Sequence, residues 1–199
     1  MAKTALAVLE SALRVRKLDR TLTTALPPLE RTDAAALAAT GLAPLDACLH
    51  GGLPRGQLSE IAGPRSSGRM TLLWQLMAAA ARRGEIAALV DPFDRVDVAS
   101  ACAAGVDLDR LLWIRGQALA RVQPSPSLDR ALDRALKALN LVLQAGGFGV
   151  VAIDLADVPP LALTRLPYTT WLRVQRAIEG SDTACVLVVP EPLARSAGG

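Results

Sequence analysis

The sequence predicts an α/β domain with a doubly wound, mainly parallel sheet flanked by helices. Short apolar runs alternate along the chain with longer segments whose apolar residues recur at helical spacing, which is typical of successive β-α-β units. The run 86–90 is apolar, as buried parallel strands are, and Asp91 follows it. The run 148–154 is apolar up to Asp154, the acid that closes it. A glycine-rich turn at 63–68 separates an earlier run from the helix after it. We therefore expect ligand-binding residues at the carboxyl ends of the strands.

Residues 1–39 are predicted to form an amphipathic helix and a linker ahead of this domain, which would occupy 40–199. The helix spans 2–20 and carries cations in its last turns, where they suit the helix dipole. The segment 21–39, which contains Pro27-Pro28, breaks the helix and is predicted to be a linker. The apolar stripe of the helix must be buried, either on a neighbouring subunit as an oligomerisation arm or on its own domain. The anchors of this stripe are Leu6, Leu9 and Leu13, and the cations are Arg14, Arg16, Lys17 and Arg20.

The elements of the domain follow in order from residue 40. A short helix is expected before the Gly51-Gly52 turn and the Pro-Arg-Gly corner at 54–56. Ser125-Pro126 is a strong helix start, because it places an N-cap residue before a proline at the first helical position. The helices are predicted at 43–49, 71–81, 96–104, 126–145 and 168–179, and the strands at 86–90, 111–114, 148–154 and 184–189, after a first strand that begins at Leu58.

The turn at 63–68 has the spacing of a phosphate-binding loop. Such a loop has two glycines with four residues between them, then Lys, which reaches the terminal phosphates, and Ser or Thr, which holds Mg²⁺. Here Arg69 and Met70 take the last two positions. A guanidinium is a planar fork, and a thioether is a poor Mg²⁺ ligand. Either the backbone cradle is kept with damaged chemistry, or the glycines serve only the turn. The candidate residues of this degenerate, possibly empty nucleotide site are Gly63, Ser66, Ser67, Gly68, Arg69, Thr71 and Asp154.

Composition favours a globular protein without a membrane segment. The chain has 199 residues, 51% of them hydrophobic, and no run of 18 apolar residues or N-terminal signal pattern, so we expect a cytoplasmic protein. A net charge of +3 permits an anionic partner without requiring one. The three cysteines, Cys48, Cys102 and Cys185, are expected to be buried small hydrophobes. No catalytic residue, metal site or required cofactor is predicted, and His50 receives no metal or catalytic role.

From residue 40 to about 190, the chain resembles the core of the bacterial RecA recombinase family. The likeness includes Thr40-Gly41, Leu45-Asp46, the segment 51–56 and Glu60-Ile61, and it continues through the loop 63–68. Further matches are Val90-Asp91, the segment 105–112 and the strand that ends at Asp154. The resemblance implies a RecA-like fold in which the N-terminal helix sits where that family has the arm that packs onto the next subunit.

The departures from the RecA pattern fall on the residues that process ATP. RecA-like ATPases have a catalytic Glu shortly after the second strand, where this chain has Phe93, and a Gln that senses the terminal phosphate, where 189–191 contains none. Asp154 matches the acid on the Mg²⁺ side and is kept. The first DNA-binding loop would fall within 156–167, shortened, with Arg165 as its only cation; the second would begin near the end of this sequence, which suggests a shortened chain. Since phosphoryl transfer depends on positioned charges, we expect no ATPase activity.

A RecA core with an eroded ATP site is similar to the ImuA family of accessory factors in SOS-induced mutagenic translesion synthesis. That resemblance implies a non-catalytic adaptor, nucleoid-associated when DNA is damaged. Its partners would be itself, an ImuB-like protein and an error-prone DnaE-type polymerase. Two alternatives remain: a RecA/RadA-type ATPase that uses Arg69 with Asp94 or Glu191, and a SulA-like inhibitor of cell division that binds FtsZ. The cations of the N-terminal helix would also allow weak or indirect DNA binding, although a solvated helix end explains them better.

Overall fold

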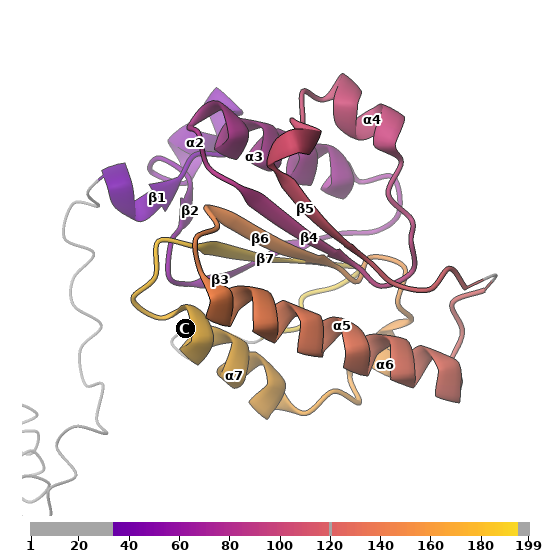
Figure 1. Cartoon of the computed structure of the whole chain (residues 1–199). Helices are drawn as coiled ribbons and strands as arrows, with labels where there is room; N and C mark the ends of the chain where they lie inside the picture. The colour runs from indigo at the N-terminus through magenta and orange to yellow at the C-terminus, as the bar shows by residue number, and fades with distance from the viewer. Residues whose placement is uncertain (1–33, 120, 195–199) are drawn as a thin grey trace, which may run out of the picture. The chain divides into compact units, whose positions relative to one another are not determined.

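The computed structural model describes residues 34–119 and 121–194, and these form a sheet covered by helices on both faces (Figure 1). The predicted arm, including Leu6, Leu9 and Leu13, lies outside the described residues. Five parallel strands form the main sheet in the order β3-β7-β6-β4-β5. These strands are β3 (Leu58–Ala62), β4 (Ala87–Asp91), β5 (Leu111–Arg115), β6 (Val150–Asp154) and β7 (Ala184–Val189).

The helices divide between the two faces of this sheet, which confirms the predicted doubly wound arrangement (Figure 1). One face packs against α3 (Arg69–Arg82) and α4 (Val98–Ala103). The other face packs against α5 (Pro126–Ala145), α6 (Pro160–Leu163) and α7 (Tyr168–Ile178). Alternate residues of each strand serve alternate faces, so Ala88 and Val90 of β4 join the α5 side while Ala87 and Leu89 join the α3 side. No described helix combines the length and the hydropathy needed to cross a bilayer.

The segment 34–38 was expected to be linker, and that expectation is wrong. It forms η2 (Ala34–Ala36) and β1 (Leu37–Ala38), and β1 pairs antiparallel with β2 (Leu53–Pro54). Ala38 is fully buried. Gly52 lies so close to it that a Cβ there would meet the Ala38 carbonyl, so the glycine turn is required for this contact.

The motifs between 40 and 56 serve the fold. The Asp46 carboxylate, in α2 (Ala43–Cys48), accepts hydrogen bonds from the Thr40 N–H and hydroxyl, both at 2.7 Å, and so fixes the preceding turn. Arg55 donates to the Asp182 carbonyl at 2.7 Å and is paired with Glu85. The Thr-Gly and Pro-Arg-Gly motifs therefore join the antiparallel pair to the main sheet.

Three further details differ from the predictions. Cys48 and Cys102 are exposed, because they lie on the outer sides of α2 and α4; only Cys185, on central strand β7, is buried. Helix α3 begins at Arg69, two residues early, because Gly68 adopts a positive φ and acts as its N-cap. Within 156–167, where a loop was expected, α6 forms and buries Ala162 and Leu163. The remaining short element is η3 (Leu108–Arg110).

Candidate functional site

The candidate site lies at the carboxyl end of the sheet, where the loop 63–68 joins β3 to α3. Ser66 and Gly68 both have positive φ values, 62° and 88°, which turn the loop sharply into the helix. A Cβ on Gly63 would meet the Ser67 hydroxyl at 2.7 Å, so the loop closes tightly on itself. Helix α3 has no side-chain cap on its first N–H groups. These groups and the helix dipole form a surface that is suited to an anion.

Arg69 does not extend toward that surface, because its side chain is buried at the ends of β6 and β7. Its Nη1 donates to the Val189 carbonyl at 2.9 Å and, in a longer contact of 3.5 Å, to the Ala156 carbonyl. Only 8% of the residue is exposed. The guanidinium therefore satisfies main-chain carbonyls that follow two strands, and it fastens the start of α3 to the sheet.

Met70 and Thr71 do not supply a metal ligand in this arrangement. Met70 is half-buried and packs against the hydrophobic cluster on the α3 side of the sheet. Thr71 is exposed and makes no hydrogen bond with the described residues. The position that would hold Mg²⁺ in a phosphate-binding loop has thus become a packing position.

Asp154 ends β6 on the same face of the sheet as Arg69, and it carries a perturbed charge. Its Oδ1 accepts a hydrogen bond from the Ala156 N–H at 2.9 Å. Burial raises the pKa of Asp154 to about 6, and Asp91 and Asp157 add to the increase, while the Ala156 N–H and Arg69 oppose it. The structure therefore brings Arg69 and Asp154 into electrostatic contact, with the loop 63–68 beside them.

The contribution of Asp154 to the free energy of unfolding should fall as the pH rises from 4 to 7, because the folded protein binds the Asp154 proton more tightly than the unfolded chain does. A shift from 3.8 to about 6 corresponds to at most about 3 kcal/mol, and partial exposure reduces this to roughly 1 to 2 kcal/mol. Asp154→Asn should stabilise the protein by that amount at pH 7 and flatten the profile. Urea unfolding at several pH values measures both effects, with Asp109→Asn, at an exposed position, as the control. A variant that is less stable at pH 7 would contradict this account.

The acids proposed to replace the catalytic Glu, Asp94 and Glu191, lie in different surroundings. The Asp94 carboxylate accepts two 2.8 Å hydrogen bonds from Arg115, whose guanidinium also stacks over Trp113 at 4.5 Å. Phe93 is 2% exposed and lies in the hydrophobic core on the α5 side. Glu191 is exposed in the segment after β7. Asp94 is thus held by Arg115 and no carboxylate stands at position 93, while Glu191 lies exposed after β7.

Asp91 is the last residue of β4, and the sequence analysis missed its role. It is 1% exposed, and its carboxylate accepts hydrogen bonds from three backbone N–H groups and from the Trp113 indole. The backbone donors are Phe93, Arg95 and Val96. An acid that directly follows a fully apolar strand was the available signal, but the donors come from a loop whose path the sequence does not give.

Comparison with known proteins agrees with this fold. The family model described as the RecA N-terminal domain matches residues 20–159, more than half of the chain. The chain belongs to the RecA N-terminal domain family. Among RecA proteins, that of Nostoc punctiforme is 46% identical over 115 residues, covering 58% of this chain and 28% of that protein. The RecA of Symbiobacterium thermophilum is 37% identical over 116 residues, covering 58% and 29%.

The chain shares the fold of RecA-like proteins but matches only part of the length of the curated RecA proteins. A crystal structure of the RadB recombinase superimposes with a TM-score of 0.53 and 22% identity, covering 78% of this chain and 70% of that one. This confirms the RecA-like α/β fold. The chain spans less than a third of the length of the curated RecA proteins that it matches. It is therefore a RecA-like domain protein, and any activity of a whole RecA protein is a separate question.

Proposed function

We propose that this RecA-like domain is a non-catalytic adaptor in which Arg69 is turned away from the nucleotide site. The observation that carries the proposal is the direction of the guanidinium, which is bonded to the Val189 and Ala156 carbonyls instead of facing the loop. The burial of Phe93 in the core supports it, since no carboxylate stands in that position. A RecA fold that neither holds nor splits ATP retains its surfaces for binding other proteins.

Titration with a fluorescent ATP analogue in the presence of Mg²⁺ tests this proposal. We expect no saturable binding below about 1 mM and no release of phosphate. The double variant Arg69→Lys/Met70→Thr should gain Mg²⁺-dependent binding without hydrolysis, because it adds an ammonium and a hydroxyl to the loop but leaves Phe93 in place. Arg65→Lys, at an exposed position of the same loop, is the matched control and should leave the protein unchanged.

A weak nucleotide-binding protein is the second candidate, and two observations favour it. The first turn of α3 lacks a side-chain cap, and the buried Asp154 carboxylate, which burial disfavours, is retained. Tight Mg²⁺-dependent binding to the unmodified protein, lost in Asp154→Ala, would favour this candidate. Steady hydrolysis of ATP as well would overturn the adaptor proposal.

For the cellular role, we propose the function of the ImuA family in SOS-induced translesion synthesis, in the cytoplasm and at the damaged nucleoid. Membership of the RecA family and the altered loop support this role. The protein would self-associate through Leu6, Leu9 and Leu13 and bind an ImuB-like protein and a DnaE-type polymerase. Co-purification with an ImuB-like protein, but not with FtsZ, would separate this role from a SulA-like one. An unchanged mass in solution after removal of residues 1–30 would argue against the arm.

A further inference from the structure

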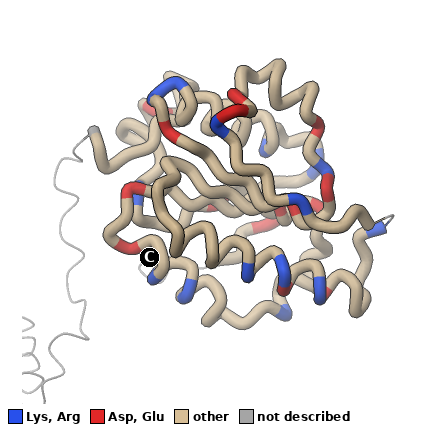
Figure 2. The backbone as a smooth tube through the Cα atoms, in the orientation of Figure 1, with Lys and Arg blue, Asp and Glu red and all other residues tan. Residues whose placement is uncertain are grey.

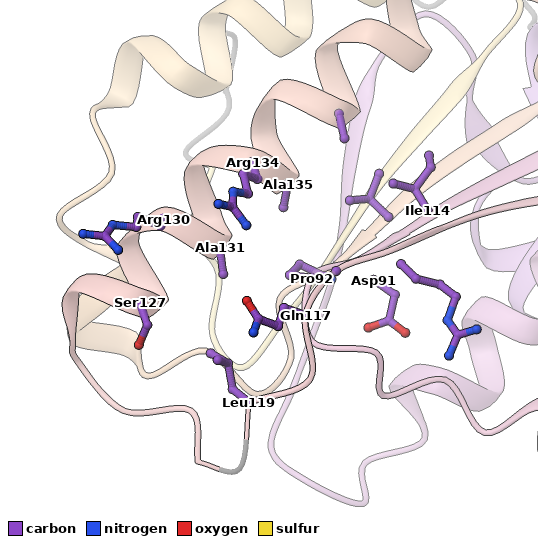
Figure 3. Close-up of a pocket in the computed structure, with 14 residues that line it drawn as sticks. Asp91, Pro92, Ile114, Gln117, Leu119, Ser127, Arg130, Ala131, Arg134 and Ala135 are labelled. Carbon is purple, nitrogen blue, oxygen red and sulfur yellow. The ribbon is translucent and has the colours of Figure 1, made fainter.

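A cleft of 640 Å³ lies between α5 and the carboxyl ends of β4 and β5 (Figure 3). Its size falls within the usual range for ligand-binding sites. The Gln117 side chain points into the space between the strand ends and α5 (Figure 3). Most of the lining is apolar, and the apolar residues are Val90, Pro92, Ile114, Leu119, Ala131, Ala135 and Ala138.

Unpaired positive charge borders this cleft. Arg130 and Arg134, one turn apart on α5, line it, and neither forms an ion pair or hydrogen bond with any described residue. Lys and Arg positions recur along α5 and α7 (Figure 2). The one acid that lines the cleft, Asp91, already accepts four hydrogen bonds. Asp133 lies about 100° round the helix from Arg134 and is paired with Lys137.

Exposed apolar side chains occur on the same two elements. Leu112 of β5 is 43% exposed and Leu141 of α5 is 68% exposed. Strand β5 is at the edge of the sheet, paired only with β4, so this side of the molecule is open. Exposed apolar residues on the elements that form an apolar cleft with a polar rim are typical of a protein interaction site.

We propose that this cleft binds an acidic peptide segment of a partner protein. One or two apolar side chains of the segment would enter between Ile114 and Ala135, and neighbouring Asp or Glu residues would pair with Arg130 and Arg134. Charge selects this occupant, because the two guanidinium groups have no acid to neutralise them. The inference concerns a second site and stands whether or not the loop 63–68 binds nucleotide.

Two other occupants fit the cleft less well. Residues 2–20 of a second copy carry five Lys or Arg residues against two acidic ones, so the arm has the same sign of charge as the rim. Single-stranded nucleic acid needs aromatic platforms for its bases, and no aromatic residue lines this cleft. An apolar floor with arginines at the rim matches a peptide with apolar anchors and carboxylates.

Selection from a displayed library of short random peptides on the immobilised full chain tests the proposal without assuming a partner sequence. Peptides are kept if they bind the unmodified chain and lose binding to Ala131→Trp, which fills the cleft. We expect this set to combine Leu, Ile or Phe with Asp or Glu and to be net negative. A set that is neutral or basic, or the absence of any cleft-dependent peptide, would overturn the proposal.

The selected peptide is then synthesised with a fluorescent label and measured by polarisation. Arg130→Glu/Arg134→Glu should weaken its binding about tenfold or more, and added salt should weaken it as well. Arg173→Glu/Arg176→Glu makes the same charge change on exposed positions of α7 and should leave the affinity unchanged. All four positions are exposed, so both variants should fold. Equal weakening by both pairs, or stronger competition by a peptide of residues 2–20 or by oligo-dT, would count against an acidic partner.

Discussion

A Phe93→Glu variant is expected to lose much of its folding stability and to gain no ATPase activity. The resemblance to RecA aligns Phe93 with a catalytic Glu, so this substitution appears to restore the missing acid. The structure gives it a different consequence, because Phe93 is 2% exposed and packs with core residues of β4, α5 and α6. Loss of a buried aromatic ring costs about 3 to 5 kcal/mol, and an unpaired buried carboxylate adds to that cost.

Urea unfolding followed by circular dichroism measures this loss. Phe93→Leu is the control, since it keeps an apolar side chain and should cost about 1.5 kcal/mol or less. If Phe93→Glu unfolded cooperatively at nearly the urea concentration of the unmodified protein, the buried position of Phe93 would be wrong. If it also released phosphate from ATP, the non-catalytic proposal would fail with it.

The position of Phe93 is also the reason why we expect that changes in the loop alone would not restore ATPase activity. The substitutions Arg69→Lys and Met70→Thr change groups at the start of α3. The missing acid would instead stand at position 93, where Phe93 forms part of the core on the other face of the sheet. The two losses are therefore structurally independent. Lysine and threonine in the loop should restore contacts to phosphate and Mg²⁺ without a group to activate water.

The sequence predicted the sheet well because each central strand is a continuous apolar run of the length that a parallel strand needs. It predicted the place of the site for a similar reason, since the loop 63–68 and Asp154 both follow such strands. The direction of Arg69 could not be predicted, because its partner carbonyl, Val189, is 120 residues away in the chain. The exposure of Cys102 was missed because a short helix with mixed small residues gives no clear apolar face.

The role of Asp91 could not be predicted either, because its hydrogen-bond donors lie in an irregular loop and on a neighbouring strand. Asp91 ends β4, and the sequence analysis gave it no role of its own; the structure uses both of its oxygens to organise the loop that follows. Oδ1 accepts from the Phe93 N–H at 3.3 Å and the Arg95 N–H at 3.0 Å. Oδ2 accepts from the Val96 N–H at 3.0 Å and the Trp113 indole N–H at 3.2 Å. The carboxylate thus has two donors on each oxygen.

Asp91→Asn should therefore be almost as destabilising as Asp91→Ala, although asparagine has nearly the same shape. An amide has one acceptor oxygen, and in either orientation its NH₂ group faces two N–H donors, which leaves them unsatisfied. We expect a loss of about 2 to 4 kcal/mol in urea unfolding, with a change in tryptophan emission if the Trp113 contact is lost. Asp94→Asn is the matched control, because it removes only an ion pair at the surface and should change the stability little. Asp91→Asn with unchanged stability would mean that the carboxylate is free to act as a ligand, and the loop would then need another explanation.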